Sequence, residues 1–374
     1  MTSEKIIGSI NPNPNPKQSI QWGTTQNSSI DFRSDVITTP STAMLTAITT
    51  STLNDDVFRE DPTTLSFESH ISQLCGHEDG AFVITGTMAN QLALRTLLTQ
   101  PPFAVLADTR AHILHFEGGS VSMSGAAVQH VRPSNGLYMR LEDIIRKAVI
   151  TDDVHKCPTR VISIENTAGG SIVPLEEMRR ISEWARGHDI KLHLDGARLW
   201  EAVAGGAGSL EDYCTLCDLV CLDFSKNLGA PMGAMVVGSR AMIAQLRRVR
   251  KSIGGAMRQC GPLAAAARVA VSEQFGTGPW GSRDTLRRVH EVAMRVGEMW
   301  VQCGGRLLRA VETNQVWVDL KYAGIETSWW NEVGRKHGVK LDGKRIVLHH
   351  QISEDAVARL GEVFSKVLNL KSHL

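Results

Sequence analysis

The chain has 374 residues, a formal net charge of +1 and 21% charged residues. Such a balanced charge favours neither a nucleic acid nor an anionic membrane as a partner. No apolar run is long enough to span a bilayer, and the N-terminus lacks the apolar core of a signal peptide, so we expect a cytoplasmic protein. The seven cysteines, an odd number scattered along the chain, are expected to be reduced thiols.

The first residues, 1–30, are expected to form a flexible N-terminal arm. They are rich in Asn, Pro, Ser, Thr and Gln, and residues 11–16 alternate Asn with Pro. A segment of this composition has too few apolar side chains to build a core. We therefore expect ordered structure from Asp31 onwards, with a large α/β domain over residues 31–262 and a small α+β domain over residues 263–374.

Short apolar runs alternate with helical patterns in the large domain, which predicts a mostly parallel sheet with right-handed crossovers. The predicted strands are residues 81–84, 104–107, 161–165, 190–194 and 219–224, and the predicted helices include residues 88–98 and 175–186.

The turn Thr85-Gly86-Thr87 joins the first predicted strand to a helix. The free N–H groups at a helix start attract anions such as phosphate. The same residue types also open most helices as plain caps, so the turn by itself leaves both interpretations open. His112 follows the next strand, either as a packed loop histidine or as an aromatic plate against a cofactor ring.

Two polar residues are expected at one edge of this sheet. Asp195 ends one strand, and Lys226 lies just after the next strand. Open α/β sheets bind ligands at the carboxyl ends of their strands, so both side chains can reach one ligand. Taken alone, the lysine also fits a solvated turn and the aspartate a helix cap. Together they fit the pair that pyridoxal phosphate (PLP) requires, a Schiff-base lysine and a carboxylate partner for the ring nitrogen.

Cys214, Cys217 and Cys221 invite comparison with a zinc site. No further Cys or His pair lies at ligand spacing nearby, and Cys221 falls within an apolar strand, so we expect no metal. Arg258 follows a Gly-Gly turn, which is either a helix break or another anion contact.

The pattern changes after about residue 262, where longer helices and short strands predict the small domain. Predicted helices cover residues 263–275, 283–301, 328–337 and 353–368, and predicted strands cover residues 315–320 and 345–350. Arg345 begins the second of these strands, as an ordinary edge charge or as a bidentate clamp for a carboxylate.

Together these motifs resemble the threonine aldolase family of fold-type I PLP enzymes. The resemblance runs from about residue 31 almost to the C-terminus and leaves only the arm outside. It implies an α/β fold with a mostly parallel seven-stranded sheet in the large domain and a small α+β C-terminal domain. The residues that carry it are Asp31-Phe32-Arg33-Ser34-Asp35, Asp55-Asp56-Val57-Phe58-Arg59-Glu60-Asp61-Pro62, Thr85-Gly86-Thr87-Met88-Ala89-Asn90, Arg110-Ala111-His112, Glu165-Asn166-Thr167, Asp195-Gly196-Ala197-Arg198, Ser225-Lys226 and Gly254-Gly255-Ala256-Met257-Arg258-Gln259.

The resemblance also implies a role for each candidate residue. Lys226 is implied as the catalytic Schiff-base lysine, Asp195 as the partner of the ring nitrogen, and His112 as the catalytic histidine stacked on the ring. The remaining implied roles are the phosphate cradle of Thr85, Gly86 and Thr87, the substrate-carboxylate clamp of Ser34, Arg198 and Arg345, a cofactor contact by Arg198, and Arg258 at a neighbouring subunit's phosphate. Members of the family share their sites between subunits, so a homodimer or homotetramer is expected.

The implied reaction is the PLP-dependent cleavage of L-threonine or L-allo-threonine to glycine and acetaldehyde. Many aldolases of the family carry a histidine at or soon after the Glu-Asn-Thr run, near the substrate hydroxyl, whereas this chain has Ala168, Gly169 and Gly170. An aldolase needs a base for that hydroxyl, so the difference leaves a second interpretation open. Some fungal members are alanine racemases, which exchange only the Cα proton. A PLP-binding protein without catalysis is the third interpretation.

Overall fold

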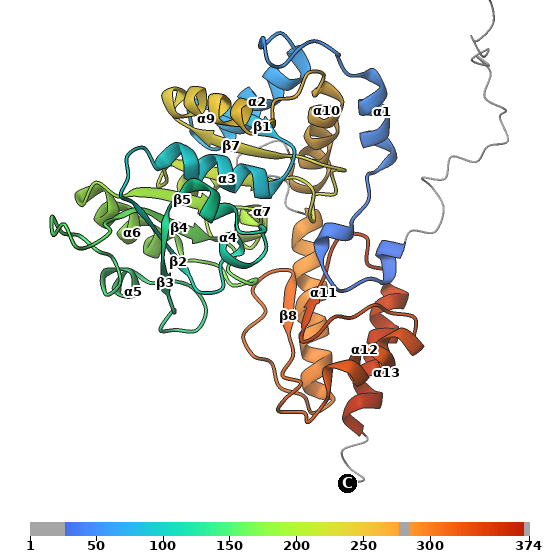
Figure 1. Ribbon diagram of the computed structural model, residues 1–374. Helices are drawn as coiled ribbons and strands as arrows, with labels where there is room; N and C mark the ends of the chain where they lie inside the picture. Colours follow the sequence, from blue (N-terminus) through green and yellow to red (C-terminus); the bar gives the residue numbers. More distant parts are fainter. Residues whose placement is uncertain (1–26, 277–283, 370–374) are drawn as a thin grey trace, which may run out of the picture.

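The computed structural model describes residues 27–276 and 284–369 (Figure 1). The arm expected over residues 1–30 therefore lies outside the described residues, except for its end. That end forms a short 3₁₀ helix, η2 (Asn27–Ile30). The carbonyl of Ile30 accepts a hydrogen bond from the N–H of Lys340 at 2.9 Å, so ordered structure begins slightly before the predicted start.

A seven-stranded sheet forms the centre of the larger part of the molecule, in the strand order β1-β7-β6-β5-β4-β2-β3. The run from β3 through β2, β4 and β5 to β6 is parallel, and β7 lies antiparallel between β1 and β6. The mostly parallel seven-stranded sheet expected from the sequence is thus confirmed. Its strands are β1 (Asp79–Val83), β2 (Ala104–Asp108), β3 (Ala127–Val131), β4 (Thr159–Glu165), β5 (Lys191–Asp195), β6 (Leu219–Asp223) and β7 (Ala234–Gly238).

Both faces of this sheet are covered by helices, which explains why its inner strands are apolar at successive positions. Along β6, Leu219 and Cys221 belong to one apolar cluster, while Val220 and Leu222 belong to another. The first cluster includes helices α3 (Gly86–Leu97) and α9 (Arg240–Ser252), and the second includes α2 (Pro62–Leu74), α6 (Leu175–Gly187) and α10 (Gly261–Ala270) (Figure 1).

Short helices complete the larger part of the molecule. They are η3 (Asp35–Ile37), α1 (Thr42–Thr50), α4 (His112–His115), η4 (Ser120–Ser124), α5 (Leu141–Ile145), α7 (Leu199–Ala204) and α8 (Leu210–Cys214). Within the described ranges, no helix combines the length and the apolarity that crossing a membrane requires.

The C-terminal part builds a separate apolar core on a two-stranded sheet. The rings of Trp300, Trp330 and Phe364 contact one another at its centre. Phe32, from the start of the described chain, is buried in the same core, so the two ends of the chain fold together. The elements are α11 (Asp284–Gln302), β8 (Gln315–Trp317), α12 (Thr327–Lys336), β9 (Arg345–Val347) and α13 (Glu354–Asn369).

Several elements differ from their predicted extents. The two C-terminal strands end earlier than expected, at Trp317 and Val347. The helix expected over residues 263–275 ends at Ala270 and continues as a π-helical turn over Val271–Phe275. The sequence does not indicate β3, because this edge strand is half-exposed and lacks a long apolar run. It also misses β7, because a short antiparallel return breaks the strand–helix–strand pattern.

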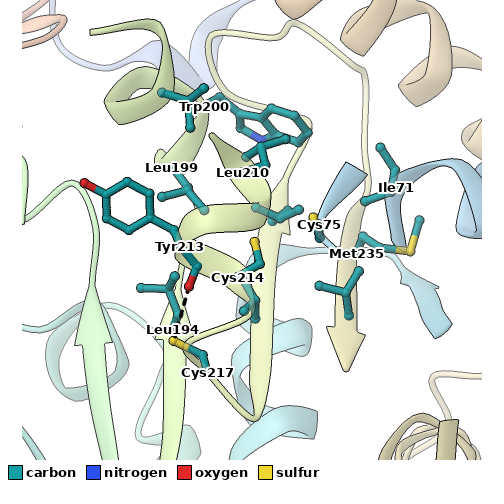
Figure 2. Packing of buried hydrophobic residues seen from close by; sticks show 14 of the residues in the cluster. Ile71, Cys75, Leu194, Leu199, Trp200, Leu210, Tyr213, Cys214, Cys217 and Met235 are labelled. Carbon is teal, nitrogen blue, oxygen red and sulfur yellow. Dashed lines mark hydrogen bonds between the residues drawn. The ribbon is translucent and has the colours of Figure 1, made fainter. Parts of the chain in front are cut away.

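Cys214 and Cys217, considered above as metal ligands, lie in the apolar core beside Cys75 and Tyr213 (Figure 2). Burial raises the pKa of the Cys214 and Cys217 thiols, which keeps them protonated. Cys221 belongs to the apolar cluster on the other face of the sheet, where its Sγ lies 3.3 Å from Nε2 of a buried histidine, His193. The three thiols therefore do not converge on one point.

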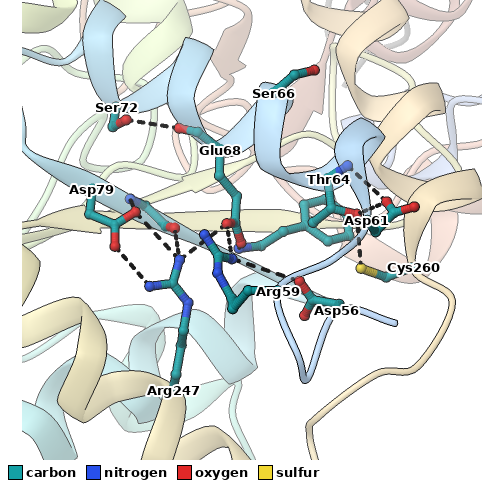
Figure 3. A network of polar contacts seen from close by, with 12 residues as sticks. Asp56, Arg59, Asp61, Thr64, Ser66, Glu68, Ser72, Asp79, Arg247 and Cys260 are labelled. Atoms are coloured by element: carbon teal, nitrogen blue, oxygen red, sulfur yellow. Dashed lines mark hydrogen bonds and ion pairs between the residues drawn. The ribbon is translucent and has the colours of Figure 1, made fainter. Parts of the chain in front are cut away.

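A cluster of ion pairs closes the β1 edge of the sheet (Figure 3). Arg59 pairs with Glu68 of α2. Arg247 of α9 lies 3.1 Å from Oε2 of the same glutamate and 2.8 Å from Oδ2 of Asp79. Arg247 also donates to the carbonyl of Gly80 at 2.6 Å, which satisfies an acceptor of this edge strand. The cluster thus links helices from the two faces of the sheet.

Candidate active site

Lys226 and Asp195 lie at the same edge of the sheet, where the sequence places them. β5 and β6 are parallel neighbours with Asp195 opposite Cys221, so their carboxyl ends meet. Asp195 is the last residue of β5, and Lys226 follows the end of β6 closely. The lysine side chain is only 13% exposed, and its Nζ lies 3.8 Å from Oδ2 of Asp223. It is therefore not the solvated turn residue that its local sequence also allows.

Asp195 is kept ionised by its surroundings. Burial opposes its charge, but the positive charge of Lys226 and further favourable contacts outweigh burial and lower the pKa of Asp195. Its Oδ2 accepts a hydrogen bond from Nδ2 of Asn90 at 2.8 Å, and its Oδ1 accepts one from the N–H of Ala197 at 3.1 Å. A charged carboxylate at this edge can pair with a protonated ring nitrogen.

His112 is connected to Asp195 through the side chains of Glu117 and Asn90, for which the sequence alone indicates no role. Nδ1 of His112 lies 2.8 Å from Oε1 of Glu117, and Nδ2 of Asn90 donates to both carboxylates at 2.8 Å. The hydrogen bond to Glu117 is the main reason that the pKa of His112 is raised. With Nδ1 engaged, Nε2 is the ring nitrogen that can face a ligand. Asn90 interrupts the buried apolar residues of α3, and that interruption is the sequence signal for it.

Glu165 is a second carboxyl group beside Asp195. It ends β4 and lies opposite Asp195 in the ladder of β4 and β5. Its Oε2 accepts a hydrogen bond from the backbone N–H of His112 at 3.0 Å. Burial, followed by the charge of Asp195, raises the pKa of Glu165 to about 7. The two carboxyl groups therefore differ in protonation state, since Asp195 is ionised and Glu165 keeps its proton up to near neutral pH.

Glu165→Gln should change the pH dependence of stability with a defined sign. Because the folded pKa of Glu165 is raised to about 7 from 4.5, the folded state holds this proton more tightly than the unfolded state. Stability of the native protein therefore falls as pH rises through this window. We therefore expect the free energy of unfolding of wild type, relative to that of the variant, to decrease from about pH 5 to pH 8, as measured by urea unfolding.

Glu183→Gln is the control for this series, because Glu183 is exposed on α6. The free energy of unfolding of this variant, relative to that of wild type, should stay constant over the same pH range. An advantage of wild type over Glu165→Gln that stays constant or grows as pH rises would contradict the assignment.

The turn Thr85–Thr87 lies beside the lysine and opens α3. Oγ1 of Thr85 accepts a hydrogen bond from the N–H of Met88 at 3.1 Å, and Gly86 is the first helical residue. The first N–H groups of a helix have no intrahelical acceptor, so the positive end of the α3 dipole lies at this turn. Gly86 has no room for a side chain, because a Cβ there would lie 2.7 Å from Oδ2 of Asp223. The predicted anion-binding turn is thus adjacent to Asp223, the ion-pair partner of Lys226.

The three residues expected to clamp a carboxylate lie together, but one of them already has a partner. Arg198 donates from Nε and Nη2 to the buried Asp35 at 2.8 Å and 2.6 Å. Ser34 caps the next short helix. Arg345 donates to the carbonyl of Arg33 at 3.3 Å, and burial and the nearby charge of Arg198 lower the pKa of Arg345. Asp35, for which the sequence alone indicates no separate role, balances the charge of Arg198.

Arg345 is the clamp arginine that has no carboxylate partner in the described part of the chain. It is half-buried, and it forms no ion pair to a carboxylate within the described ranges. Arg258, by contrast, is 68% exposed and pairs with Asp55 at 2.9 Å. The ion pair that Arg258 forms within the described residues is thus with Asp55 and not with a residue of this site.

The loop after β4, residues 168–170, is held by the C-terminal part. Nε1 of Trp317 donates to the carbonyl of Gly169 at 2.8 Å, and Oγ1 of Thr313 donates to that of Gly170 at 2.7 Å. The guanidinium of Arg309 stacks on the Trp317 ring at 4.9 Å. Loop 168–170 itself contributes no side chain that could act as a base.

The arrangement fits a phosphorylated, cationic ring cofactor better than a metal. His112, Glu117 and Asp195 lie close enough to share an ion, with potential ligand atoms within 4.8 Å of one another. However, the Asn90 amide donates to both carboxylates, so a cation between them would face its N–H groups. Asp195, Lys226 and the start of α3 would hold the ring nitrogen, the aldehyde carbon and the phosphate of such a cofactor, respectively.

The fold and this edge of the sheet define a fold-type I enzyme of the PLP-dependent class. The chain belongs to the beta-eliminating lyase family, whose model matches residues 31–323.

Known relatives of the chain agree with this assignment. The chain is 54% identical over 352 residues to the alanine racemase TOXG of Cochliobolus carbonum, covering 94% of this chain and 90% of that protein. It is 41% identical over 332 residues to the low-specificity L-threonine aldolase of Eremothecium gossypii, covering 88% and 85%. The solved structure of Leishmania major threonine aldolase has a TM-score of 0.77 at 20% identity, covering 91% and 99%. The resemblance to the threonine aldolase family is thus confirmed.

Proposed function

We propose that the chain binds PLP at the carboxyl edge of β5 and β6 and acts at the Cα of a small amino acid. The observation that carries the proposal is Asp195, which is kept ionised near the mostly buried Lys226 at the ends of adjacent strands. When bound, PLP supplies the electron withdrawal that weakens the bonds at Cα. Asp195 would hold the ring nitrogen protonated, His112 would cover the ring, and the turn Thr85–Thr87 would bind the phosphate.

The substrate carboxylate would pair with Arg345. Arg198 already shares its charge with Asp35, so its contribution is to hold Ser34 and the following segment in position beside Arg345. A carboxylate fixed in this way sets the rotation of the substrate, and that rotation decides which bond at Cα breaks.

The reaction that we propose is the cleavage of L-threonine or L-allo-threonine to glycine and acetaldehyde. The step needs a group that takes the proton of the β-hydroxyl. His112 is the candidate for this proton, directly or through a water, because Glu117 engages its Nδ1 and leaves Nε2 toward the ligand. The threonine aldolase relatives support this reaction.

Alanine racemisation is the second candidate. It is favoured by loop 168–170, which offers no base for a hydroxyl, and by the similarity to an alanine racemase. Lys226 would move the Cα proton on one face. Coupled detection of acetaldehyde from L-threonine, beside chiral analysis of alanine, separates the two. Acetaldehyde without D-alanine would support the aldolase and exclude the racemase, and D-alanine without acetaldehyde would do the reverse.

Ala168→His should raise threonine cleavage relative to alanine racemisation. Help from a general base is worth roughly 10²–10⁴-fold, so a gain of about tenfold or more is expected if the new ring reaches the hydroxyl. The ratio of acetaldehyde formation to D-alanine formation measures it. Ala168→Leu is the matched control, since it adds bulk without a base. An equal change in both variants would show that the loop acts through shape alone.

We further propose that the protein is a homodimer or homotetramer with sites shared between subunits. Arg258 supports this, since its side chain is 68% exposed and pairs with Asp55 rather than with a residue of its own chain's site. Light scattering of the purified protein gives the subunit number.

A further inference from the structure

Asp223 is a buried carboxylate at the corner between Lys226 and the start of α3. Its Oδ1 accepts hydrogen bonds from the N–H and the hydroxyl of Ser225, both at 2.7 Å. Its Oδ2 lies 3.8 Å from Nζ of Lys226. The same Oδ2 would lie 2.7 Å from a Cβ on Gly86, so it rests against the first residue of the helix.

This position is electrostatically suited to an anion. Lys226 supplies a positive charge, and the 12-residue helix α3 directs the positive end of its dipole to the same corner. The turn Thr85–Thr87 offers that helix end to the phosphate of PLP. A phosphate there would lie next to a second negative group that is fixed by Ser225. Like charges only a few ångströms apart and shielded from water repel each other strongly.

We propose that Asp223 is a resident anion that competes with the cofactor phosphate for the start of α3 and so limits the affinity of the enzyme for PLP. The inference rests on the proposed function, since it assumes that PLP binds at this edge. Its consequence is an enzyme that releases and rebinds its cofactor more readily than the turn alone would allow. The competing interpretation is that Asp223 only balances the charge of Lys226.

Asp223→Asn distinguishes the two interpretations. The amide has nearly the shape of the carboxylate, and its oxygen can still accept the two hydrogen bonds from Ser225. The cofactor is removed from wild type and variant, and both are titrated with PLP and with pyridoxal, which lacks the phosphate. Both aldehydes attach at Lys226, so an effect on the lysine changes both affinities, whereas an effect on the phosphate changes only one.

We expect the Kd for PLP to fall by at least about tenfold in Asp223→Asn, with the Kd for pyridoxal unchanged. The release of PLP, followed by the loss of its absorbance into a scavenger, should slow in parallel. Glu183→Gln, which removes the same charge from the exposed face of α6, should leave both constants at the wild-type values.

Three results would overturn the inference. These are an unchanged Kd for PLP, a higher Kd for PLP, or equal changes in the Kd values for PLP and pyridoxal. A far-ultraviolet circular dichroism spectrum and a urea midpoint close to wild type show that the variant is folded before it is titrated. If wild type binds neither aldehyde, the proposed function itself fails, and that outcome is distinct from the three above.

Discussion

Lys226→Ala should lose the reducible covalent attachment of PLP and lower turnover at Cα by at least about 10³-fold. The lysine is the one residue proposed both to hold the cofactor and to move a proton, and general acid–base help alone contributes roughly 10²–10⁴-fold. Its side chain is only 13% exposed, and its charge helps to keep Asp195 ionised, so the loss affects two groups of the site at once. Borohydride treatment followed by peptide mass spectrometry should place the cofactor label on Lys226 in wild type only.

Lys191→Ala is the matched control. Lys191 lies at the opposite end of β5, where it pairs with Asp218 at 3.3 Å. This variant should keep the label and the turnover. Reduction that labels a different lysine, or a Lys226→Ala variant with wild-type turnover, would remove the basis of the proposed function.

Asp35→Ala should lower the free energy of unfolding by about 3–5 kcal/mol. Asp35 is fully buried and accepts two hydrogen bonds from Arg198 and one from Nδ2 of Asn314 at 3.1 Å. Removing one partner of a buried ion pair leaves the other charge without compensation, which is far more destabilising than losing an exposed pair. Urea unfolding of wild type and variant at neutral pH measures the difference.

Glu354→Ala is the control for this comparison. Its pair with Arg295 is exposed, with 74% and 48% of the two side chains accessible, so the expected loss is at most about 1 kcal/mol. Equal losses in the two variants would show that Asp35 is not a buried partner of Arg198.

Acid should weaken the ion pair between Asp35 and Arg198, and the lowered pKa of Asp35 determines the pH range in which this happens. Burial opposes the charge of Asp35, but Arg198 outweighs burial and holds the pKa of this carboxyl well below its usual 3.8. A lowered folded pKa adds stability above the unfolded value, and that stability is lost as pH falls through the folded value. The difference between wild type and Asp35→Ala should therefore persist at mildly acidic pH and shrink only in strong acid.

The sequence by itself determined the elements that carry the proposed cofactor residues. Asp195 and Lys226 each follow a short apolar run that ends at small or turn-forming residues, and such runs report buried parallel strands directly. The sequence also predicted the turn Thr85–Thr87, because an apolar run precedes it and a helical pattern follows it. Because parallel strands present their carboxyl ends at one edge, the local patterns also predicted that Asp195 and Lys226 would lie close together.

Only the tertiary structure decided the partners of those residues. Asn90 bonds to Asp195 across 105 positions of the chain, and Arg198 bonds to Asp35 across 163. Asn90 stands out in the sequence only as a polar residue among the apolar positions of α3, and Asp35 lies in a local sequence that also suits a solvated position. Neither local pattern indicates the distant residue that becomes the partner. Arg198 illustrates the limit, since the resemblance implies a substrate-carboxylate contact for it, whereas only the structure shows its ion pair with the buried Asp35. A buried charge needs a partner, and which residue becomes that partner depends on how the distant segments pack.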